Sequence, residues 1–321
     1  DVIWSCTTCR ACERICPLHI QHLDLILEMR KSLVLMESRF PEELQETFNN
    51  LENQFNPWGF AAEKRADWCR GLDVALMSDH PDAEILYFVG CAGAFDERGK
   101  VVARAIVNLL KKAEIDFAIL GPEERCTGDA ARRAGNEYVA QELIRANLDT
   151  LGKYKPAKIL TGCPHCYNTL KHEYPQFGAM PEVLHHTEFF AGLIQNGILK
   201  PYVNLETTVT LHDSCYLCRW NDMIDAPRKI LGAIGGLKIR EMERSGRKGL
   251  CCGAGGSRMF MEEKIGKRIN IERVEEVAAT KAGTLVAACP FCNTMLNDGV
   301  KETAPDIAVK DIAEILDQAT G

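Results

Sequence analysis

Short apolar runs alternate with longer amphipathic segments along most of the chain, and this alternation predicts the elements of an α/β protein. Buried strands are expected at residues 84–90, 116–120, 157–161, 208–212 and 284–288. Helices are expected at 20–37, around 102–110, from Asp129 to about 150, at 226–234 and from Met259 to about 280. Because strands that alternate with helices form mainly parallel sheets, we predict short parallel sheets preceded by a helical segment.

The second half of this pattern repeats the first, which indicates an internal duplication. The matched cysteines lie 124 to 126 residues apart: Cys91, Cys126, Cys163 and Cys166 correspond to Cys215, Cys251, Cys289 and Cys292. The closing segments also correspond, since the stretch that begins at His186 aligns with the one that begins at Ile312. We therefore predict a helical module over 1–80, a first repeat over 81–204 and a second repeat over 205–321.

Composition narrows the class of protein mainly through its cysteines. The chain has 15 cysteines among 321 residues, and all but Cys69 fall into three groups. An odd number in a chain of this length argues against a secreted disulfide framework and favours metal or cluster binding. The net charge of −7 argues against a nucleic-acid partner, and no apolar run reaches the ~18 residues of a membrane span. We expect a cytoplasmic protein, or one that a partner holds at the cytoplasmic face of the membrane.

The first cysteine group, Cys6, Cys9, Cys12 and Cys16 followed by Pro17, has the spacing of a bacterial ferredoxin motif. Thiolates at this spacing wrap a cubane 4Fe-4S cluster, with a zinc knuckle as the alternative. In two-cluster ferredoxins the fourth cysteine ligates the other cluster, and this chain has no second run. Either all four cysteines close on one cubane, or the fourth serves a cluster whose other ligands would precede the first residue.

The second repeat has five cysteines, one more than a tetrahedral zinc site uses. They are Cys215, Cys251, Cys252, Cys289 and Cys292. Adjacent thiolates such as Cys251 and Cys252 rarely fit one zinc ion, whereas a multi-iron cluster with bridging sulfurs accommodates both. The glycines that follow, Gly253, Gly255 and Gly256, have no P-loop lysine after them. We interpret them as positions where the backbone approaches the cluster closely.

The first repeat has only four candidate ligands, because Thr127 stands where the second repeat has Cys252. The four are Cys91, Cys126, Cys163 and Cys166. Four thiolates suit a cubane 4Fe-4S cluster, and they also suit a zinc ion. The sequence leaves both possibilities open.

These motifs resemble the cysteine-rich, or CCG, domain family of iron–sulfur proteins. Its members include catalytic subunits of heterodisulfide reductase, iron–sulfur subunits of glycolate, lactate and anaerobic glycerol-3-phosphate oxidoreductases, and electron-transfer-flavoprotein:menaquinone oxidoreductases. The resemblance extends over nearly the whole chain, and its strongest stretches are 4–9, 126–129, 212–217, 251–256 and 288–292.

The resemblance implies a duplicated α/β fold with a noncubane 4Fe-4S cluster at the five cysteines of the second repeat. It also implies a helical ferredoxin-like module at the N-terminus, of a type that often carries two clusters and would be incomplete here. Thr127 departs from the family pattern, which argues against a second noncubane cluster in the first repeat.

Three functions remain open on sequence alone. The favoured one is an electron relay in an oxidoreductase: a flavoprotein, such as electron-transfer flavoprotein or a flavin dehydrogenase, supplies single electrons that pass to a quinone-linked or other acceptor. A membrane cytochrome b and menaquinone module is one such acceptor. The second is disulfide reduction of the heterodisulfide type at the five-cysteine cluster, and the third is a zinc-stabilised scaffold. A flavoprotein partner is implied because the chain carries no flavin signature, and no side chain is assigned to catalysis.

Polar residues near the cysteines are expected mainly at the surface. The expected surface residues are His165 on a turn, His185 and His186 at a helix start, and Arg258 and Arg273 on a helix. His212, three residues before Cys215, is open to two interpretations. It donates a hydrogen bond to a cluster sulfur or couples a proton to reduction, or it makes a structural hydrogen bond at a strand end.

Overall fold

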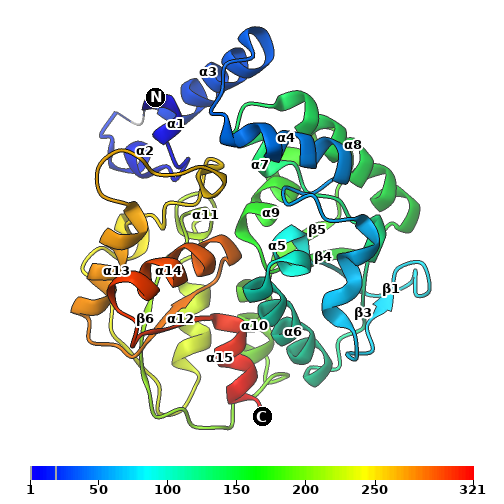
Figure 1. Ribbon diagram of the computed structural model, residues 1–321. Helices are drawn as coiled ribbons and strands as arrows, with labels where there is room; N and C mark the ends of the chain where they lie inside the picture. Colours follow the sequence, from blue (N-terminus) through cyan, green and yellow to red (C-terminus); the bar gives the residue numbers. More distant parts are fainter. Residues whose placement is uncertain (1, 19) are drawn as a thin grey trace.

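A computed structural model describes residues 2–18 and 20–321 and contains two parallel sheets with helices packed around them (Figure 1). The first sheet has five strands in the order β1-β3-β2-β4-β5, and the second has four in the order β7-β6-β8-β9. The described strand pairs are parallel in both sheets. The predicted α/β class with short parallel sheets is confirmed.

The strands are short, and those at the centre of each sheet are buried. The first sheet contains β1 (Ala75–Leu76), β2 (Ile85–Phe88), β3 (Phe117–Ile119), β4 (Lys158–Thr161) and β5 (Glu182–His185). The second contains β6 (Thr208–Leu211), β7 (Lys238–Ile239), β8 (Thr284–Ala287) and β9 (Ala308–Asp311). Leu86 and Phe88 are both fully buried, as expected for a parallel strand covered on its two faces.

The topology confirms the internal duplication. The order β3-β2-β4-β5 becomes β7-β6-β8-β9 when each strand number is raised by four. The register is preserved as well: Leu86 pairs with Ile159 in the first sheet. The corresponding pair in the second sheet is Thr210 with Leu285.

Helices connect the strands in both repeats. The first repeat contains α5 (Gly90–Phe95), α6 (Glu97–Lys112), α7 (Asp129–Arg133), α8 (Glu137–Tyr154), α9 (Pro164–Asn168) and α10 (His186–Gln195). The second contains α11 (Cys215–Cys218), α12 (Asp225–Gly232), α13 (Ile269–Ala279), α14 (Pro290–Thr303) and α15 (Ile312–Ala319). The N-terminal module contains α1 (Val2–Ser5), α2 (Ala11–Ile15), α3 (His22–Glu37) and α4 (Glu43–Gln54). The helix predicted at 20–37 is therefore confirmed as α3.

The two repeats share one hydrophobic core, because helices of each repeat pack against helices of the other. Helix α6 of the first repeat packs against α15, the last helix of the second, and α12 of the second packs against α10, the last helix of the first. Ile106 of α6 and Ile312 of α15 lie in this core together with Ile230 of α12. Each repeat therefore fixes the position of the other, and with it the spacing between their cysteines.

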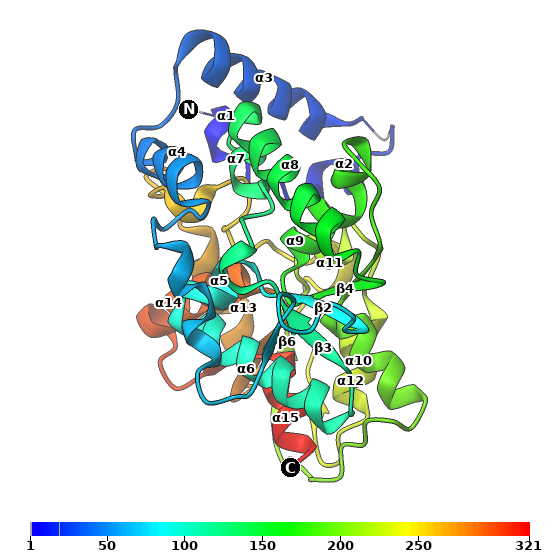
Figure 2. The ribbon, with the colours of Figure 1, turned by 90° about the vertical axis from the view of Figure 1, so that its right-hand side faces the viewer.

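Helices α1, α2 and α3 of the N-terminal module lie at the end of the molecule opposite the C-terminus (Figures 1 and 2). Arg30 of α3 attaches the module to both repeats, because Nη1 donates to the carbonyl oxygens of Arg133 at 2.7 Å and Gly256 at 3.0 Å. Nη2 donates to the carbonyl oxygens of Ile3 and Cys6, each at 2.7 Å. Arg30 is fully buried, so one cation joins three parts of the chain.

The helix predicted from Asp129 to about residue 150 is wrong in one respect, since it is broken into α7 and α8. Gly135 lies at the break with a φ of 86°. A Cβ atom on Gly135 would lie 2.5 Å from the backbone carbon of Arg30, so the chain turns here to admit α3. The side chain of Asn136 then caps α8 by accepting a backbone hydrogen bond.

The helix predicted from Met259 to about residue 280 is also shorter than expected. Its first half is irregular apart from a short 3₁₀ turn, and α13 begins only at Ile269. Gly266 has a φ of 72°, which a continuous helix does not allow. The Glu263 carboxylate accepts a hydrogen bond from the Ile269 N–H at 3.1 Å, and so pairs a backbone donor that has no partner within the first turn of α13.

Candidate metal centres

The strand order brings the cysteines of each repeat to one edge of its sheet. Cys91 and Cys163 follow β2 and β4, which pair directly with each other. Cys215 and Cys289 occupy the same places after the paired strands β6 and β8. Because parallel strands end at the same edge, residues far apart in sequence become neighbours there. Proline occupies the first helical position after Cys163 and after Cys289.

The four predicted ligands of the first repeat converge on one small cavity. Cys91, Cys126, Cys163 and Cys166 all line it, and each is at most 9% exposed. A hydrogen bond from Cys126 and the nearby Arg65 guanidinium lower the pKa of Cys91 to about 6. Such a thiol deprotonates readily, which is what a metal ligand requires.

Side chains around this cavity donate hydrogen bonds to its sulfurs. Arg65 donates from Nη2 to the Cys91 Sγ at 3.4 Å, and the Thr127 hydroxyl donates to the Cys166 Sγ at 3.8 Å. Arg65 also forms a buried ion pair with Glu124 at 2.8 Å. Burial raises the pKa of Glu124 to about 7. Thr127, which stands in place of the fifth cysteine, thus lies directly beside the Cys166 thiol.

The five cysteines of the second repeat also form one buried group. Cys215, Cys251, Cys252, Cys289 and Cys292 belong to a single packed cluster, and each is at most 7% exposed. The neighbouring thiols Cys251 and Cys292, together with burial, act on the pKa values of Cys215 and Cys252, which lie well above the ordinary value. A ring nitrogen of His212 and the Sγ atoms of Cys252 and Cys292 lie within 4.8 Å of one another.

Two buried cations accompany the five-cysteine site. Arg219 is fully buried and donates from Nε to the Cys9 carbonyl at 2.6 Å and from Nη1 to the Gly249 carbonyl at 2.6 Å. Arg273 is fully buried on α13. Burial, together with these two cations, holds the pKa of His212 well below its ordinary value. A neighbouring thiol and burial raise the pKa of Cys215 well above its ordinary value, and the positive charge of Arg219 opposes this effect.

The ferredoxin-type motif joins this second site. A hydrogen bond with Cys251, together with burial, raises the pKa of Cys9, so the two thiols are in contact. Burial and the charges of Cys6 and Cys9 raise the pKa of Cys12, which places these three thiols near one another. Cys12 is exposed, and Cys16 follows α2 in a half-buried position.

A stack of aromatic rings connects the three groups of cysteines. The rings of His165 and Tyr216 stack with centroids 3.8 Å apart, and Tyr216 stacks on Trp220 at 4.9 Å. The Arg10 guanidinium lies 3.5 Å from the centroid of Trp220. His165 also contacts Phe291 edge to face at 5.1 Å, and these two residues lie in the two corresponding Cys-Pro-x-Cys turns.

Several residues predicted at the surface are in fact buried, because partners from distant segments cover them. His165, His185, His186 and Arg273 are each at most 5% exposed. His165 lies under Tyr216, and its Nδ1 is 2.9 Å from an Asp129 carboxylate oxygen. Burial disfavours the charged imidazole, yet Asp129 raises the pKa of His165 above its ordinary value. No local sequence signal distinguishes these residues from exposed ones.

Two of the glycines after Cys252, Gly255 and Gly256, allow a close approach of protein backbone. A Cβ atom on Gly255 would lie 2.2 Å from the Thr7 carbonyl oxygen. A Cβ atom on Gly256 would lie 2.3 Å from the Cys6 carbonyl oxygen. Gly255 and Gly256 therefore seat the N-terminal motif against the second repeat, which corrects the interpretation for these two glycines.

Gly255→Ala is expected to destabilise the protein by about 1–3 kcal/mol, because the new methyl group overpacks the contact with Thr7. Gly152→Ala is the matched control, since Gly152 lies within α8 and has open space around its Cα. That control is expected to stabilise the protein by about 0.5–1 kcal/mol through helix propensity. Chemical denaturation of anaerobically purified protein measures both, and equal stability of the two variants would contradict the tight docking.

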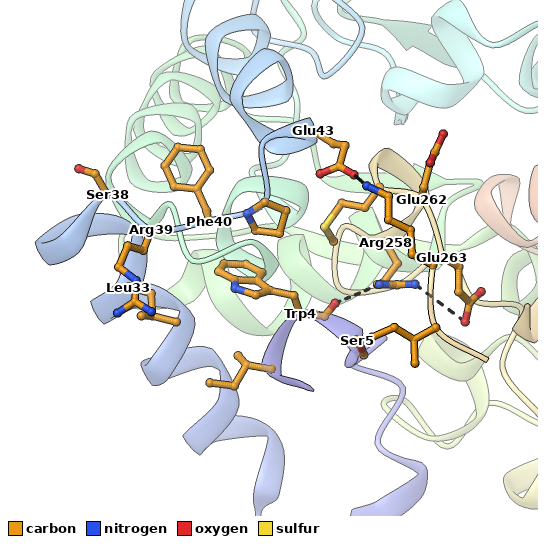
Figure 3. Close-up of a pocket in the computed structure, with 15 residues that line it drawn as sticks. Trp4, Ser5, Leu33, Ser38, Arg39, Phe40, Glu43, Arg258, Glu262 and Glu263 are labelled. Atoms are coloured by element: carbon orange, nitrogen blue, oxygen red, sulfur yellow. Dashed lines mark hydrogen bonds and ion pairs between the residues drawn. The ribbon is translucent and has the colours of Figure 1, made fainter. Parts of the chain in front are cut away.

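A large cavity of about 1030 Å³ lies apart from the cysteines (Figure 3). Trp4 and Phe40 contribute to its apolar wall, and Arg258 lies opposite them. Arg258 donates to the Trp4 carbonyl oxygen at 3.5 Å and pairs with Glu263 at 3.9 Å. The cavity marks the joint between the N-terminal module and residues 258–265, so it is not the centre of the chemistry.

The duplicated parallel sheets and their convergent thiols define a protein with two cysteine-rich domains. The family described as "Cysteine-rich domain", or CCG, matches residues 85–171 and 209–297, which covers the core of both repeats. The chain belongs to this family.

Relatives extend the likeness to the whole chain. "Probable iron-sulfur-binding oxidoreductase FadF" of Bacillus subtilis is 43% identical over 99% of this chain and 46% of its own length. "EtfAB:quinone oxidoreductase" of Syntrophomonas wolfei is 44% identical over 98% of this chain and 46% of its own length. A subunit of the dihydromethanophenazine:CoB--CoM heterodisulfide reductase of Methanosarcina barkeri is 35% identical over 100% of this chain and 78% of its own length.

The chain spans about half the length of the first two of these relatives. Within residues 2–18 and 20–321, no helix has both the length and the apolar character needed to cross a membrane.

Proposed function

We propose that this chain is the iron–sulfur electron-transfer part of an oxidoreductase and that its three cysteine groups hold clusters that pass single electrons. The observation that carries the proposal is the contact between groups. Cys9 lies against Cys251, which connects the N-terminal module with the second repeat. His165 and Phe291, which lie within the two Cys-Pro-x-Cys turns, contact each other edge to face at 5.1 Å, which connects the first repeat with the second. Three neighbouring sites in one chain suit a series of electron carriers better than isolated structural metals.

The number of thiols supports two kinds of cluster among the three sites. Five convergent thiols in the second repeat suit a noncubane 4Fe-4S cluster, and the four in the first repeat suit a cubane. Zinc is the alternative in the first repeat, but hydrogen bonds from Arg65 and Thr127 to two of its sulfurs favour a redox cluster, whose potential such bonds adjust. The N-terminal motif suits a cubane at Cys6, Cys9 and Cys12. Cys16 either completes that cubane or ligates a second cluster.

We assign these roles to three domains. The ferredoxin-like module is assigned to residues 1–80, the first repeat to 81–204 and the second to 205–321, with β1 (Ala75–Leu76) joining the sheet of the first repeat. The proposed ligands are Cys6, Cys9, Cys12, Cys16, Cys91, Cys126, Cys163, Cys166, Cys215, Cys251, Cys252, Cys289 and Cys292. Thiolate ligands of this kind persist in a reducing compartment, so we place the protein in the cytoplasm or at the cytoplasmic face of a membrane.

The names of the relatives support a flavoprotein donor and a quinone-linked acceptor. The Syntrophomonas relative is named for EtfAB and quinone. We propose that an electron-transfer flavoprotein or a flavin dehydrogenase delivers electrons to the exposed ferredoxin-type motif, where Cys12 reaches the surface. The electrons would leave towards a quinone-linked module, for example one containing a membrane cytochrome b, or towards another redox subunit.

A second candidate is disulfide reduction at the five-cysteine site, which the name of the Methanosarcina relative favours. A catalytic cluster needs an opening through which a disulfide reaches it. The five cysteines are each at most 7% exposed, and this burial favours the relay.

The relay predicts rapid reduction by a flavoprotein. When anaerobic protein is mixed with reduced electron-transfer flavoprotein, its visible cluster absorbance is expected to decrease on the time scale of a rapid-mixing experiment. The EPR signals of the reduced clusters are expected to appear together. Protein treated with an iron chelator serves as the control and is expected to accept no electrons. Reoxidation by a mixed disulfide, without any reaction with the flavoprotein, would contradict the relay and favour the second candidate.

A further inference from the structure

His212 lies between a buried arginine and two thiols of the second repeat. It follows β6 directly, and its backbone N–H donates to the Val286 carbonyl oxygen at 2.8 Å, which fixes the base of the side chain. The residue is 1% exposed, and a ring nitrogen lies within 4.8 Å of the Sγ atoms of Cys252 and Cys292. The imidazole therefore borders the space that a cluster on these thiols would fill.

Arg273 determines which ring nitrogen of His212 carries hydrogen. The Arg273 Nε–H donates to His212 Nδ1 at 3.1 Å. A guanidinium has donors only, so Nδ1 must present its lone pair and the neutral imidazole carries its hydrogen on Nε2. Nε2 is buried and has no hydrogen-bond partner among the described residues. Burying the Nε2–H group without an acceptor costs free energy, so an acceptor is expected at the site.

Arg273 is itself held firmly in place. It is fully buried, and its Nη1 donates to the Arg244 carbonyl oxygen at 2.9 Å. The same Nη1 pairs with Glu276, one turn further along α13. These contacts leave the guanidinium little freedom to turn away, so the hydrogen bond to His212 is a fixed feature of the fold.

We propose that His212 donates its Nε2–H to a sulfur at the five-cysteine site and thereby raises the reduction potential of that site. The inference rests on the proposed function, because the accepting sulfur belongs to a cluster or to its thiolate ligands. One-electron reduction by the flavoprotein donor adds negative charge to the sulfurs, and a hydrogen bond to a more negative acceptor is stronger. No bond to the imidazole forms or breaks, and the proton remains on Nε2.

The same geometry excludes His212 as a ligand in the structure described. Ligation through Nδ1 would displace the Arg273 hydrogen bond, and ligation through Nε2 would require loss of its hydrogen. The first repeat lacks this device, because the register of the two sheets places Phe88 at the position that corresponds to His212. The two repeats therefore donate hydrogen bonds to their sulfurs from different residues, the first from Arg65 and the second from His212.

The test is an EPR-monitored redox titration of the second-repeat signal in the anaerobic, cluster-loaded protein. His212→Phe introduces the residue of the first repeat and is expected to disfavour reduction about tenfold, a fall of about 59 mV for a one-electron couple. His212→Gln keeps an N–H donor and is expected to recover part of that loss. Arg273→Leu removes both the hydrogen bond that fixes the tautomer and a buried positive charge, so a fall in potential is expected there too. Arg268→Leu, just before α13, is the control and is expected to leave the potential unchanged.

An unshifted potential in His212→Phe with full iron content would overturn the inference. Loss of iron from the second repeat in both His212 variants would also overturn it, because that result marks a ligand. If His212→Phe does not fold, the Arg273→Leu variant provides the test. An unshifted reduction potential in Arg273→Leu then counts against the proposal. Absence of iron in the unmodified protein would instead refute the proposed function, so the two failures are distinguishable.

Discussion

Replacing Cys252 with serine is expected to remove the cluster of the second repeat, a loss of about four iron atoms per chain. Cys252 is 3% exposed and in contact with both Cys251 and Cys292. A serine hydroxyl stays protonated at neutral pH and is a poor ligand for iron, so one of the five thiolate ligands is lost. Iron analysis and EPR of the reduced, anaerobic protein measure the change, and the signals of the other sites are expected to remain.

Cys218→Ser is the matched control for this experiment. Cys218 is 1% exposed on the same short helix as Cys215, yet its thiol faces the Asp213 carbonyl oxygen at 3.9 Å. It is not among the proposed ligands, so the variant is expected to keep its full iron content. Equal iron in the Cys252 and Cys218 variants would contradict the proposed ligand set.

Replacing Arg30 with leucine is expected to destabilise the protein by about 4 kcal/mol, since several buried carbonyl groups lose their hydrogen-bond donor at once and each unpaired group costs about 1–3 kcal/mol. The affected carbonyls include those of Cys6, Arg133 and Gly256, which belong to three different parts of the molecule. The N-terminal module is expected to loosen first, because Arg30 is its central attachment. Denaturant unfolding of the anaerobic protein gives the free energy of unfolding.

Lys31→Met tests whether that loss is specific to Arg30. Lys31 is the next residue on α3 and pairs with Glu28 at the surface. Exposed pairs contribute little, so the control is expected to change stability by less than about 0.5–1 kcal/mol. If both variants unfolded at the same denaturant concentration, Arg30 would not have the linking role described here.

The cysteine groups and the central strands could be predicted from sequence because their signals are local. Apolar runs mark β2 and β4 wherever the strands lie in space, and vicinal cysteines such as Cys251 and Cys252 restrict the metal chemistry by themselves. The duplication was equally visible, because insertions between the halves are few and the cysteine spacing is nearly constant. The parallel order and register of the sheets then agree with what the repeat predicted.

The features that sequence reasoning missed depend on contacts between distant segments. Gly135 breaks a predicted helix because the backbone of Arg30 lies against it, more than a hundred residues earlier in the chain. His165 is buried because Tyr216 of the other repeat stacks on it. Arg273 is buried on α13, where His212 from another element accepts its hydrogen bond. Each residue has an ordinary sequence context, so only the assembled fold shows its role.

The most direct test of the account is the metal and sulfide content of the anaerobically purified chain, measured on the sample used for EPR. Three 4Fe-4S clusters predict about twelve iron atoms with a similar amount of acid-labile sulfide and little zinc. The reduced sample is expected to show signals broadened by interaction between neighbouring clusters. Stoichiometric zinc with little iron or sulfide would contradict the electron relay and favour a scaffold held together by metal.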